Sequence, residues 1–375
     1  MARTAKPKLS AEIRPEWVED IDALMETINQ NYGAGTVVLG SQTTTRRRYF
    51  STGSTALDIA LCGGFAENYI TEIRGPFSAG KTTLLLLGIC AFQRKYKHGL
   101  AAIVDAERSW DRIYAERLGV DLDRIHIVNP DSGEQGANVI RDLMDCNQET
   151  LIGIDSIAAM TPSQEITDPI EKANMALQAR LINRAMRIIT ARMKRSAYDT
   201  SAPSITVLAL NQLRQKVGVM FGNPETTPGG EGQNFYYGVR IRVASNAGGE
   251  VRETVKKAGM ERTMRIQQTI SFKVSKNKAG GPQNEEGEAI WQVRDPKTKD
   301  LVLKFDNVTP LLEHGVFHDI VEVVDGKDFA YGDFQASKKG FLRALSEDLE
   351  MRRMLKKAII QKLWDEWLIE KRGSK

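Results

Sequence analysis

The sequence is poor in cysteine. Its 375 residues include three, Cys62, Cys90 and Cys146, which are far apart and odd in number. This pattern gives neither a disulfide framework nor a C-x-x-C metal site. Sparse thiols of this kind are typical of a reducing compartment, and we therefore expect a cytoplasmic protein.

The sequence also lacks a long apolar run and a strong excess of charge. The longest apolar run, "TTLLLLGICAF", is well short of a membrane span and is expected to be a buried helix. The basic start "MARTAKPKLS" has no apolar region after it, so we expect no signal peptide. The net charge of +4 is too small to indicate a nucleic-acid-binding protein by itself. A local excess of 11 Lys or Arg over 6 Asp or Glu in residues 335–375 fits a solvated helical surface or a basic face for a polyanion.

Apolar runs and helical patterns alternate from about residue 51 onward. The strand-like runs are "NYITEIRG", "LAAIVDAE", "DRIHIVNP", "TLIGIDSI", "SITVLAL" and "YYGVRIRV". Helical stretches such as "GKTTLLLLGICAFQRKY" and "NMALQARLINRAMRIITARMKRS" lie between several of them. Near-continuous apolar strands that alternate with helices predict an α/β fold with a buried, mostly parallel central sheet.

Three parts are expected along the chain. Residues 1–42 carry an amphipathic helix and a short strand, "TVVLG", which must pack on the main domain or on a neighbouring molecule because they cannot form a core alone. Residues 43–303 form the α/β core, in which the glycine-rich, charged stretch 246–265 is expected to be a hairpin or a mobile excursion. Residues 304–375, where the strand alternation fades, are predicted to form a small C-terminal α+β domain.

The clearest motif is "GPFSAGKT", Gly75 to Thr82, which matches G-x-x-x-x-G-K-[ST]. An apolar strand precedes it and a strong helix follows directly. The backbone amides of such a loop cradle phosphate oxygens, and the helix adds its positive N-terminal end. Lys81 is expected to reach the β and γ phosphates, and the hydroxyl of Thr82 to coordinate Mg²⁺. The alternative is a glycine turn with a solvated lysine.

Acidic residues follow two of the expected strands. Asp155 ends "TLIGIDS", where a phosphate-loop protein needs a carboxylate on the side of the metal, and "AAIVDAE" ends in Asp105 and Glu107. ATP hydrolysis needs a group that orients and deprotonates the attacking water, and Glu107 is our candidate. A helix-capping or ion-paired acid is the alternative for this residue.

The motifs together resemble the RecA family of homologous-recombination ATPases, specifically the bacterial type. The similarity runs from about residue 33 to about residue 331. It is carried by "STGSTALDIAL", "GPFSAGKTT", "DAERSWDRIYAERLGVD", "IDSIAAMTPSQEI", "NQLRQKVGVMFGNPETTPGG", "VSKNK" and "LLEHGVFHDIVEVV". The resemblance implies a RecA-type phosphate-loop ATPase core, and an N-terminal helix and strand that dock on the next subunit to build a helical filament.

The resemblance also implies the residues that bind and hydrolyse ATP. Gln212 senses the γ-phosphate, Tyr114 stacks on the adenine, and Thr82 and Asp155 hold Mg²⁺. The implied catalytic residues are Glu107, Lys81, Gln212, Lys276 and Lys278, the two last acting in trans on the ATP of the adjacent subunit. The implied nucleotide-binding residues are Gly75, Pro76, Ser78, Ala79, Gly80, Lys81, Thr82, Thr83, Asp111, Tyr114, Asp155 and Ser156. Without the resemblance, Lys276 and Lys278 are two surface lysines beside a glycine turn.

Two loops are implied to bind DNA. The first spans roughly Ser163 to Met175. The second is the long basic, glycine-rich and partly apolar loop Asn211 to Gly230, in which Met220 and Phe221 face bases or a neighbouring subunit. The implied DNA-binding residues are Met175, Arg180, Arg187, Arg214, Lys216, Val217, Gly229, Gly230 and Lys273. Contacts to the backbone are neutral to sequence, as a recombinase requires when base pairing reads the sequence.

The chain departs from the family in three places. It ends "WDEWLIEKRGSK" instead of in an acidic tail, the stretch 245–278 is longer than its counterpart, and Ser271 stands where an arginine usually does. The missing acidic tail predicts freer loading on duplex DNA. The longer stretch and Ser271 put binding of a second DNA strand and co-protease activity in doubt. They indicate a divergent member, for which a mobile-element or viral origin is one interpretation.

The sequence therefore predicts a DNA-dependent ATPase that polymerises on single-stranded DNA and catalyses homologous pairing and strand exchange in recombination and repair. Its expected partners are single-stranded DNA, homologous duplex DNA and further copies of itself, with ATP at the subunit interfaces and Mg²⁺ as cofactor. Three alternatives stay open. They are a ring-shaped DNA motor of the related helicase type, a mediator protein that binds without hydrolysis, and a small-molecule phosphate-loop kinase.

Overall fold

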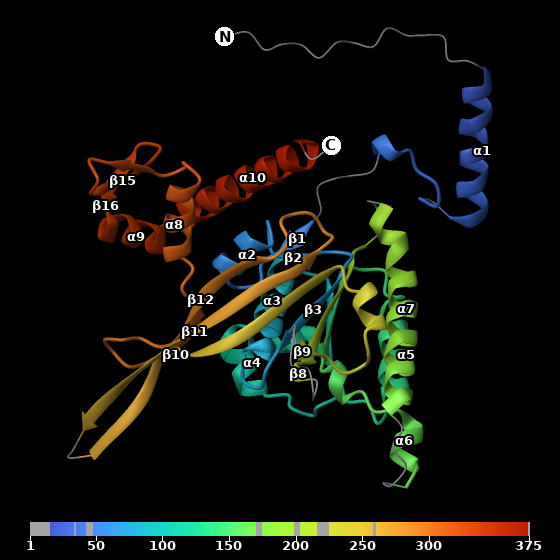
Figure 1. Ribbon diagram of the computed structural model, residues 1–375, viewed down its shortest axis with the longest axis horizontal. Coiled ribbons are helices and arrows are strands. Elements are labelled where there is room, and N and C mark those ends of the chain that lie inside the picture. The colour runs from blue at the N-terminus through green and yellow to red at the C-terminus, as the bar shows by residue number, and fades with distance from the viewer. Residues whose placement is uncertain are drawn as a thin grey trace.

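The computed structural model describes residues 16–33, 35–42, 48–169, 175–198, 203–215, 225–257 and 260–373. Within these ranges an α/β core carries a helix, α1 (Glu16–Tyr32), that stands away from it at one end and a smaller lobe at the other (Figure 1). None of the helices in the described ranges is long and apolar enough to cross a bilayer.

A nine-stranded sheet forms the centre of the core, with the order β13-β12-β11-β10-β3-β7-β6-β4-β5. The strands from β10 to β5 run parallel to their neighbours, and those from β10 to β13 are antiparallel. The bounds are β3 (Ile70–Gly75), β4 (Leu100–Asp105), β5 (Ile125–Val128), β6 (Thr150–Asp155), β7 (Ile205–Gln212), β10 (Val239–Lys257), β11 (Met260–Asn277), β12 (Glu285–Arg294) and β13 (Leu301–Phe305). The prediction of an α/β fold with a mostly parallel sheet is confirmed.

Alternating side chains of the parallel strands bury both faces of the sheet. On β7, Leu208 and Leu210 pack in one apolar cluster with α3 (Lys81–Lys95). Their neighbours Val207 and Ala209 pack in a second cluster with α5 (Gly133–Leu143) and α7 (Met175–Tyr198). Because successive residues of a strand point to opposite faces, near-continuous apolar runs need helices on both sides. The carboxyl ends of these strands then meet at one edge, where ligands bind in open α/β sheets.

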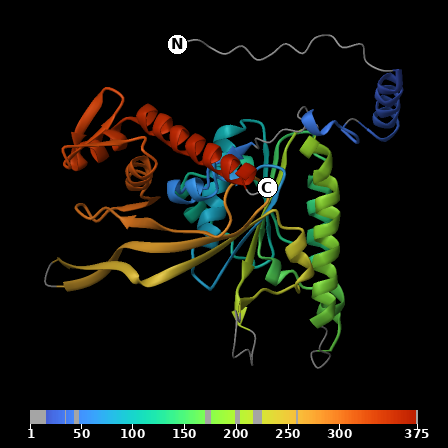
Figure 2. The same ribbon diagram turned by 45° about the horizontal axis from the view of Figure 1, so that its top comes forward.

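The antiparallel end of the sheet carries a long hairpin. Strands β10 and β11 pair from Val239↔Asn277 to Lys257↔Met260, with shifts of register along the way. In both views the hairpin (yellow and orange) extends beyond the sheet (Figures 1 and 2). The hairpin expected over residues 246–265 is therefore present.

The C-terminal lobe is a small α+β unit whose apolar cluster also includes Ile59 of the core. It contains α8 (Thr309–Phe317), β14 (Glu322–Val324), β15 (Asp328–Tyr331), β16 (Phe334–Ser337), α9 (Lys338–Glu347) and α10 (Leu349–Gly373). The ammonium group of Lys356 on α10 forms an ion pair with Asp58, whose side chain is fully buried in the core. The indole N–H of Trp364 donates to the carbonyl oxygen of Cys62 over 3.1 Å. These contacts attach the lobe to the core.

The short elements are β1 (Tyr49–Phe50), β2 (Phe65–Ala66), β8 (Arg214–Gln215), β9 (Glu225–Thr226), α2 (Thr55–Ala60), α4 (Arg112–Leu118), α6 (Ser163–Thr167), η1 (Gly40–Gln42), η2 (Leu122–Arg124), η3 (Ile157–Ala159) and η4 (Gly232–Phe235). All three cysteines are free thiols.

The strand expected over "TVVLG" is not formed, and this expectation was wrong for the single chain. Thr36 to Leu39 adopt bend and irregular structure, and Gly40 begins the helix η1. A strand needs a partner for its backbone groups, and these residues pair with no strand among the described ranges. The expected helix is present as α1, with Ile21 and Leu24 44% and 54% exposed. An amphipathic helix with an uncovered apolar face lacks the surface that it would bury.

Candidate functional site

The loop between β3 and α3 has the geometry of a phosphate cradle. Gly80 adopts a left-handed conformation, with φ of 85°, directly before the first residue of α3. A Cβ atom on Gly75 would lie 2.2 Å from the carbonyl oxygen of Val243 on β10. Both positions therefore require glycine. The first amides of α3 have no partner within the helix, which makes this end of the helix suited to an anion.

Lys81 is the cation of this loop. Its ammonium group donates to the carbonyl oxygens of Gly75 and Pro76 over 3.1 and 2.8 Å. Burial lowers the pKa of Lys81, although the nearby carboxylates of Asp155 and Glu107 act in the opposite direction. The side chain is therefore folded over its own loop, within reach of the place where phosphates would lie.

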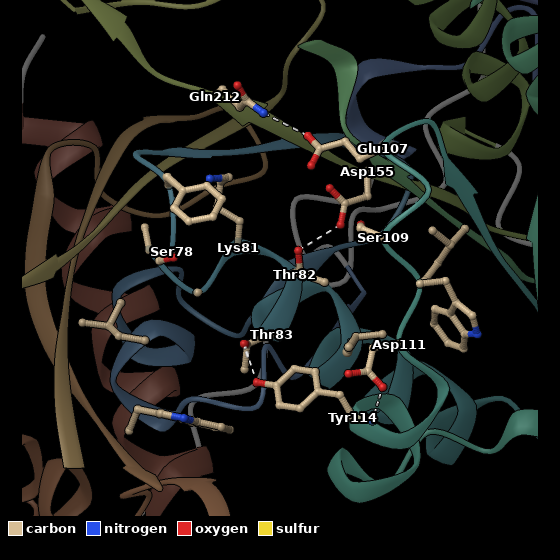
Figure 3. A pocket seen from close by; sticks show the side chains of 18 of the residues that line it. Ser78, Lys81, Thr82, Thr83, Glu107, Ser109, Asp111, Tyr114, Asp155 and Gln212 are labelled. Atoms are coloured by element: carbon tan, nitrogen blue, oxygen red, sulfur yellow. Dashed lines mark hydrogen bonds between the residues drawn. The ribbon is translucent and has the colours of Figure 1, made fainter. Parts of the chain in front are cut away.

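Two oxygen ligands suited to a hard cation lie side by side in the cavity. The hydroxyl of Thr82 donates to Oδ2 of Asp155 over 2.9 Å (Figure 3). Burial raises the pKa of Asp155 to about 6, since desolvation outweighs the opposing hydrogen bond from Thr82. The described residues hold no cluster of three or more His, Cys, Asp or Glu that suits a metal ion. The oxygens of Thr82 and Asp155 fit Mg²⁺, which keeps several waters and takes other ligands from phosphates.

Glu107 is held by two side chains from neighbouring strands. Ser156 donates a hydrogen bond to its Oε1, and the amide of Gln212 donates to the same oxygen over 3.0 Å (Figure 3). Asp105 differs, because its two oxygens accept from the backbone N–H groups of Ser109 and Trp110 over 3.1 and 2.9 Å. Of the two acids at the carboxyl end of β4, Glu107 is thus the one whose carboxylate points into the cavity toward other side chains.

The far end of the cavity is aromatic. The hydroxyls of Tyr114 and Thr83 lie 2.7 Å apart (Figure 3). Asp111 caps the N-terminus of α4 by accepting from the backbone N–H of Tyr114 over 2.9 Å. The cavity measures about 600 Å³ and joins this end to the phosphate loop. Its size suits a nucleotide, and the sequence-predicted residues Lys81, Thr82, Glu107, Asp111, Tyr114, Asp155 and Gln212 all line it.

The cavity wall also includes residues of the antiparallel strands that were not predicted from the sequence. Arg265 and Gln268 come from β11, and Trp291 comes from β12. Trp291 is 6% exposed and packs edge-on against Phe305, with 4.9 Å between the ring centroids. No local motif marks these residues, because they reach the cavity through the pairing of β10, β11 and β12.

A second surface brings together an arginine-bearing helix and the end of the long loop. Arg180 and Arg187 on α7 line a shallow cavity with Arg184, Asn183 and Tyr236. The side-chain amide of Asn183 donates to the carbonyl oxygen of Gly229 over 3.4 Å. Gly229 and Gly230 have φ of 92° and 75°. Arg184 was missed in the sequence, although its spacing from Arg180 and Arg187 places it on the same face of the helix.

Comparison with known proteins decides the family. The sequence model of the RecA N-terminal domain matches residues 19–291. "Protein RecA" of Streptococcus uberis is 40% identical over 283 residues, covering 74% of this chain and 71% of that protein. "Protein RecA" of Streptococcus sanguinis is 39% identical over 280 residues, covering 74% and 69%. The chain belongs to the RecA family. Membership supports a general role in DNA recombination and repair, with ATP and DNA as ligands.

Several residues assigned by resemblance to the RecA family lie apart from the nucleotide cavity. Lys276 and Lys278 do not line it. The ammonium group of Lys276 instead donates to the carbonyl oxygen of Asn234 over 2.6 Å. Burial, reinforced by Lys278 and Arg240, lowers the pKa of Lys276 to about 8. Their predicted role in trans, on the ATP of an adjacent subunit, stays a prediction.

The remaining DNA-binding predictions are spread over other elements. Arg214 is exposed at the start of β8. Lys273 on β11 forms an ion pair with Glu286 on β12, directly opposite it in the sheet. Met175 is the first residue of α7. Lys216, Val217, Met220 and Phe221 lie outside the described residues. The roles of all these residues in binding DNA stay predictions.

Proposed function

We propose that the protein is a DNA-dependent ATPase that forms a helical filament on single-stranded DNA and catalyses homologous pairing and strand exchange. The hydrogen bond between Gln212 and Glu107 is the observation that carries the proposal. Gln212 ends β7, the strand that leads into the long loop, and Glu107 follows β4. The proposed catalytic carboxylate is thereby joined directly to the proposed DNA loop.

In the proposed reaction, the loop Gly75–Thr82 binds the triphosphate and Lys81 moves from its own carbonyls to the β and γ phosphates. Thr82 and Asp155 would hold Mg²⁺, which would neutralise charge on the phosphate oxygens. Glu107 accepts the proton of the attacking water, and Ser156 and Gln212 orient its carboxylate. Tyr114 and Asp111 hold the adenine.

The filament proposal rests on surfaces that one subunit leaves uncovered. The apolar side chains of Ile21 and Leu24 on α1 are exposed, and we propose that this helix, with the segment after it, docks on the next subunit. The same head-to-tail contact brings Lys276 and Lys278 to the γ-phosphate of a neighbouring ATP. The proposed division is residues 1–42 for polymerisation, 43–303 for the ATPase core with the DNA loops, and 304–375 for the C-terminal domain.

The proposed path of single-stranded DNA runs along α7 and the end of the long loop. Arg180, Arg184 and Arg187 supply cations for phosphates, and the amides of Gly229 and Gly230 supply neutral donors. Met175, Arg214, Lys216 and Val217 complete this proposed path, and Lys273 is assigned to the second DNA strand. Because these contacts address the backbone, they leave the bases free to pair with the homologous strand.

The test is the rate of ATP hydrolysis with and without single-stranded DNA. The proposal predicts strong stimulation by DNA, with Lys81→Ala inactive under both conditions. A rate that DNA leaves unchanged overturns the proposal. Electron microscopy with DNA and a non-hydrolysable ATP analogue separates a helical filament from the closed rings of a helicase-type motor.

A further inference from the structure

The nucleotide cavity contains a second cation besides the lysine of the phosphate loop. Among its described lining residues, Lys81 and Arg265 carry positive charge, against the four carboxylates of Asp105, Glu107, Asp111 and Asp155. A triphosphate that enters this cavity needs cations to offset both its own charge and that of the carboxylates. No motif in the sequence places Arg265 in this cavity.

The hairpin passes directly over the phosphate loop. On β11, Cδ1 of Ile270 lies 3.0 Å from the place that a Cβ atom on Gly80 would occupy. Gln268 and then Arg265 follow along the same strand toward the tip, and both line the cavity. Arg265 therefore belongs to a strand whose position over the phosphate loop is fixed by packing.

A break in the register explains why Arg265 faces the cavity. Gln267 pairs with Val251, but the next pair is Arg265 with Arg252, so Ile266 is an extra residue in β11. In a regular strand Arg265 and Gln268 would point to opposite faces. The bulge turns the arginine to the side of Gln268. Arg265 accordingly donates to Oε1 of Gln268 over 3.3 Å.

The local charges leave this arginine available to an anion. Glu250 on β10 accepts from both Arg265 and Arg252, the latter over 3.1 Å. One carboxylate thus faces two guanidinium groups, and the cluster keeps a net positive charge. The side chain of Arg265 is 45% exposed, and a guanidinium has donors left to form a bidentate contact with phosphate.

We propose that Arg265 binds the phosphate oxygens of the nucleotide held in its own subunit, so that the extended hairpin β10–β11 forms part of the nucleotide site. The inference rests on the proposed nucleotide-binding function. It differs from the trans role of Lys276 and Lys278, because Arg265 acts within the subunit that holds the phosphate loop. Glu250 is the carboxylate that competes with the phosphates for this arginine.

The test is equilibrium binding of a fluorescent ATP analogue, with adenosine as a competitor that has no phosphates. Arg265→Ala is expected to weaken binding of the ATP analogue about tenfold, in line with the loss of one charge-assisted contact, and to leave binding of adenosine unchanged. Arg265→Lys is expected to restore part of the affinity. Arg262→Ala is the matched control, since Arg262 is exposed on the same strand, pairs with Val255 and does not line the cavity.

Glu250→Gln separates contact with the nucleotide from a merely structural role in the hairpin. If Arg265 only secures the hairpin through Glu250, the two variants weaken ATP binding equally, and the inference is overturned. The inference predicts that Glu250→Gln binds ATP as tightly as the wild type or more tightly, because the arginine loses a competing carboxylate. Unchanged ATP binding by Arg265→Ala, with Lys81→Ala defective, overturns this inference alone. Absence of ATP binding by the wild type overturns the proposed function as well.

Discussion

The side-chain amide of Gln212 donates a hydrogen bond to Oε1 of Glu107, with 3.0 Å between the two atoms. Strands β7 and β4, which carry these residues to the same edge of the sheet, are separated there by β6. A γ-phosphate or an ordered loop that moved Gln212 would therefore change the orientation of the carboxylate. The proposed coupling between ATP and DNA would pass through this contact.

Glu107→Gln tests the proposed general base. The amide keeps the size of the side chain but accepts no proton, so ATP hydrolysis in the presence of DNA is expected to fall about 100-fold or more. Binding of an ATP analogue, measured by fluorescence, is expected to persist. Asp105→Asn is the comparison, since Asp105 binds backbone amides. An unchanged rate in Glu107→Gln would remove Glu107 from the mechanism.

The raised pKa of Asp155, about 6, predicts a pH-dependent difference from Asp155→Asn. The usual pKa of an aspartate in an unfolded chain is about 3.9. Between these values the folded protein binds more protons than the unfolded chain, so this group contributes less stability as the pH rises through about 6. We compare the free energies of unfolding of the wild type and Asp155→Asn without Mg²⁺ at about pH 5 and about pH 7, below and above the pKa. The wild type is expected to lose stability relative to Asp155→Asn between these two values.

Urea unfolding of both proteins at the two pH values measures that difference. Addition of Mg²⁺ and a non-hydrolysable ATP analogue is expected to stabilise the wild type more than Asp155→Asn at the higher pH, because the ionised carboxylate binds the cation. A difference in stability that is the same at both values would show that Asp155 does not titrate in this range.

The lowered pKa of Lys276, about 8, predicts an alkaline limit to DNA-dependent ATP hydrolysis. As the pH rises through 8 the ammonium group loses its proton, and with it the charge that is proposed to act in trans. Lys276→Arg keeps its charge because arginine does not titrate in this range. The pH profile of kcat is expected to fall above about pH 8 in the wild type and to be flatter in Lys276→Arg. Identical profiles would argue against the role of Lys276.

The ion pair between Lys356 and Asp58 predicts how firmly the C-terminal lobe is attached. Lys356→Met leaves a fully buried carboxylate without its cation, which is expected to cost about 3 kcal/mol of the free energy of unfolding. Urea unfolding followed by tryptophan fluorescence measures the change. Lys357→Met, at an exposed position next to it in α10, is the control and is expected to change stability by less than about 0.5 kcal/mol. Equal effects of the two substitutions would deny the ion pair this role.

Site residues that belong to a local motif, or that lie at the end of an apolar strand, were predictable from the sequence. The phosphate loop, Asp155 and Glu107 are each adjacent to a strand whose apolar run is visible, and the edge of a parallel sheet brings such ends together. Asp111 and Tyr114 followed from the resemblance. The pairing of Glu107 with Ser156 and Gln212 depends on strand order, which apolar runs do not give.

Features that depend on distant pairing were not predictable. Arg265 enters the cavity because one extra residue shifts the register of a hairpin, and nothing near Arg265 in the sequence marks that shift. Gly75 is required by the carbonyl oxygen of Val243, which is far away along the chain. The expected strand over "TVVLG" fails for a related reason, since its β-prone residues need a partner that the described part of the chain does not supply.

In the proposed function, the nucleotide state controls the binding of DNA. The most direct measurement is the affinity of the wild-type protein for fluorescently labelled single-stranded DNA, determined by anisotropy with a non-hydrolysable ATP analogue and with ADP at the same Mg²⁺ and salt concentrations. We expect markedly tighter binding with the ATP analogue, and loss of this difference in Gln212→Ala. Equal affinities of the wild type in the two nucleotide states would contradict the proposed function.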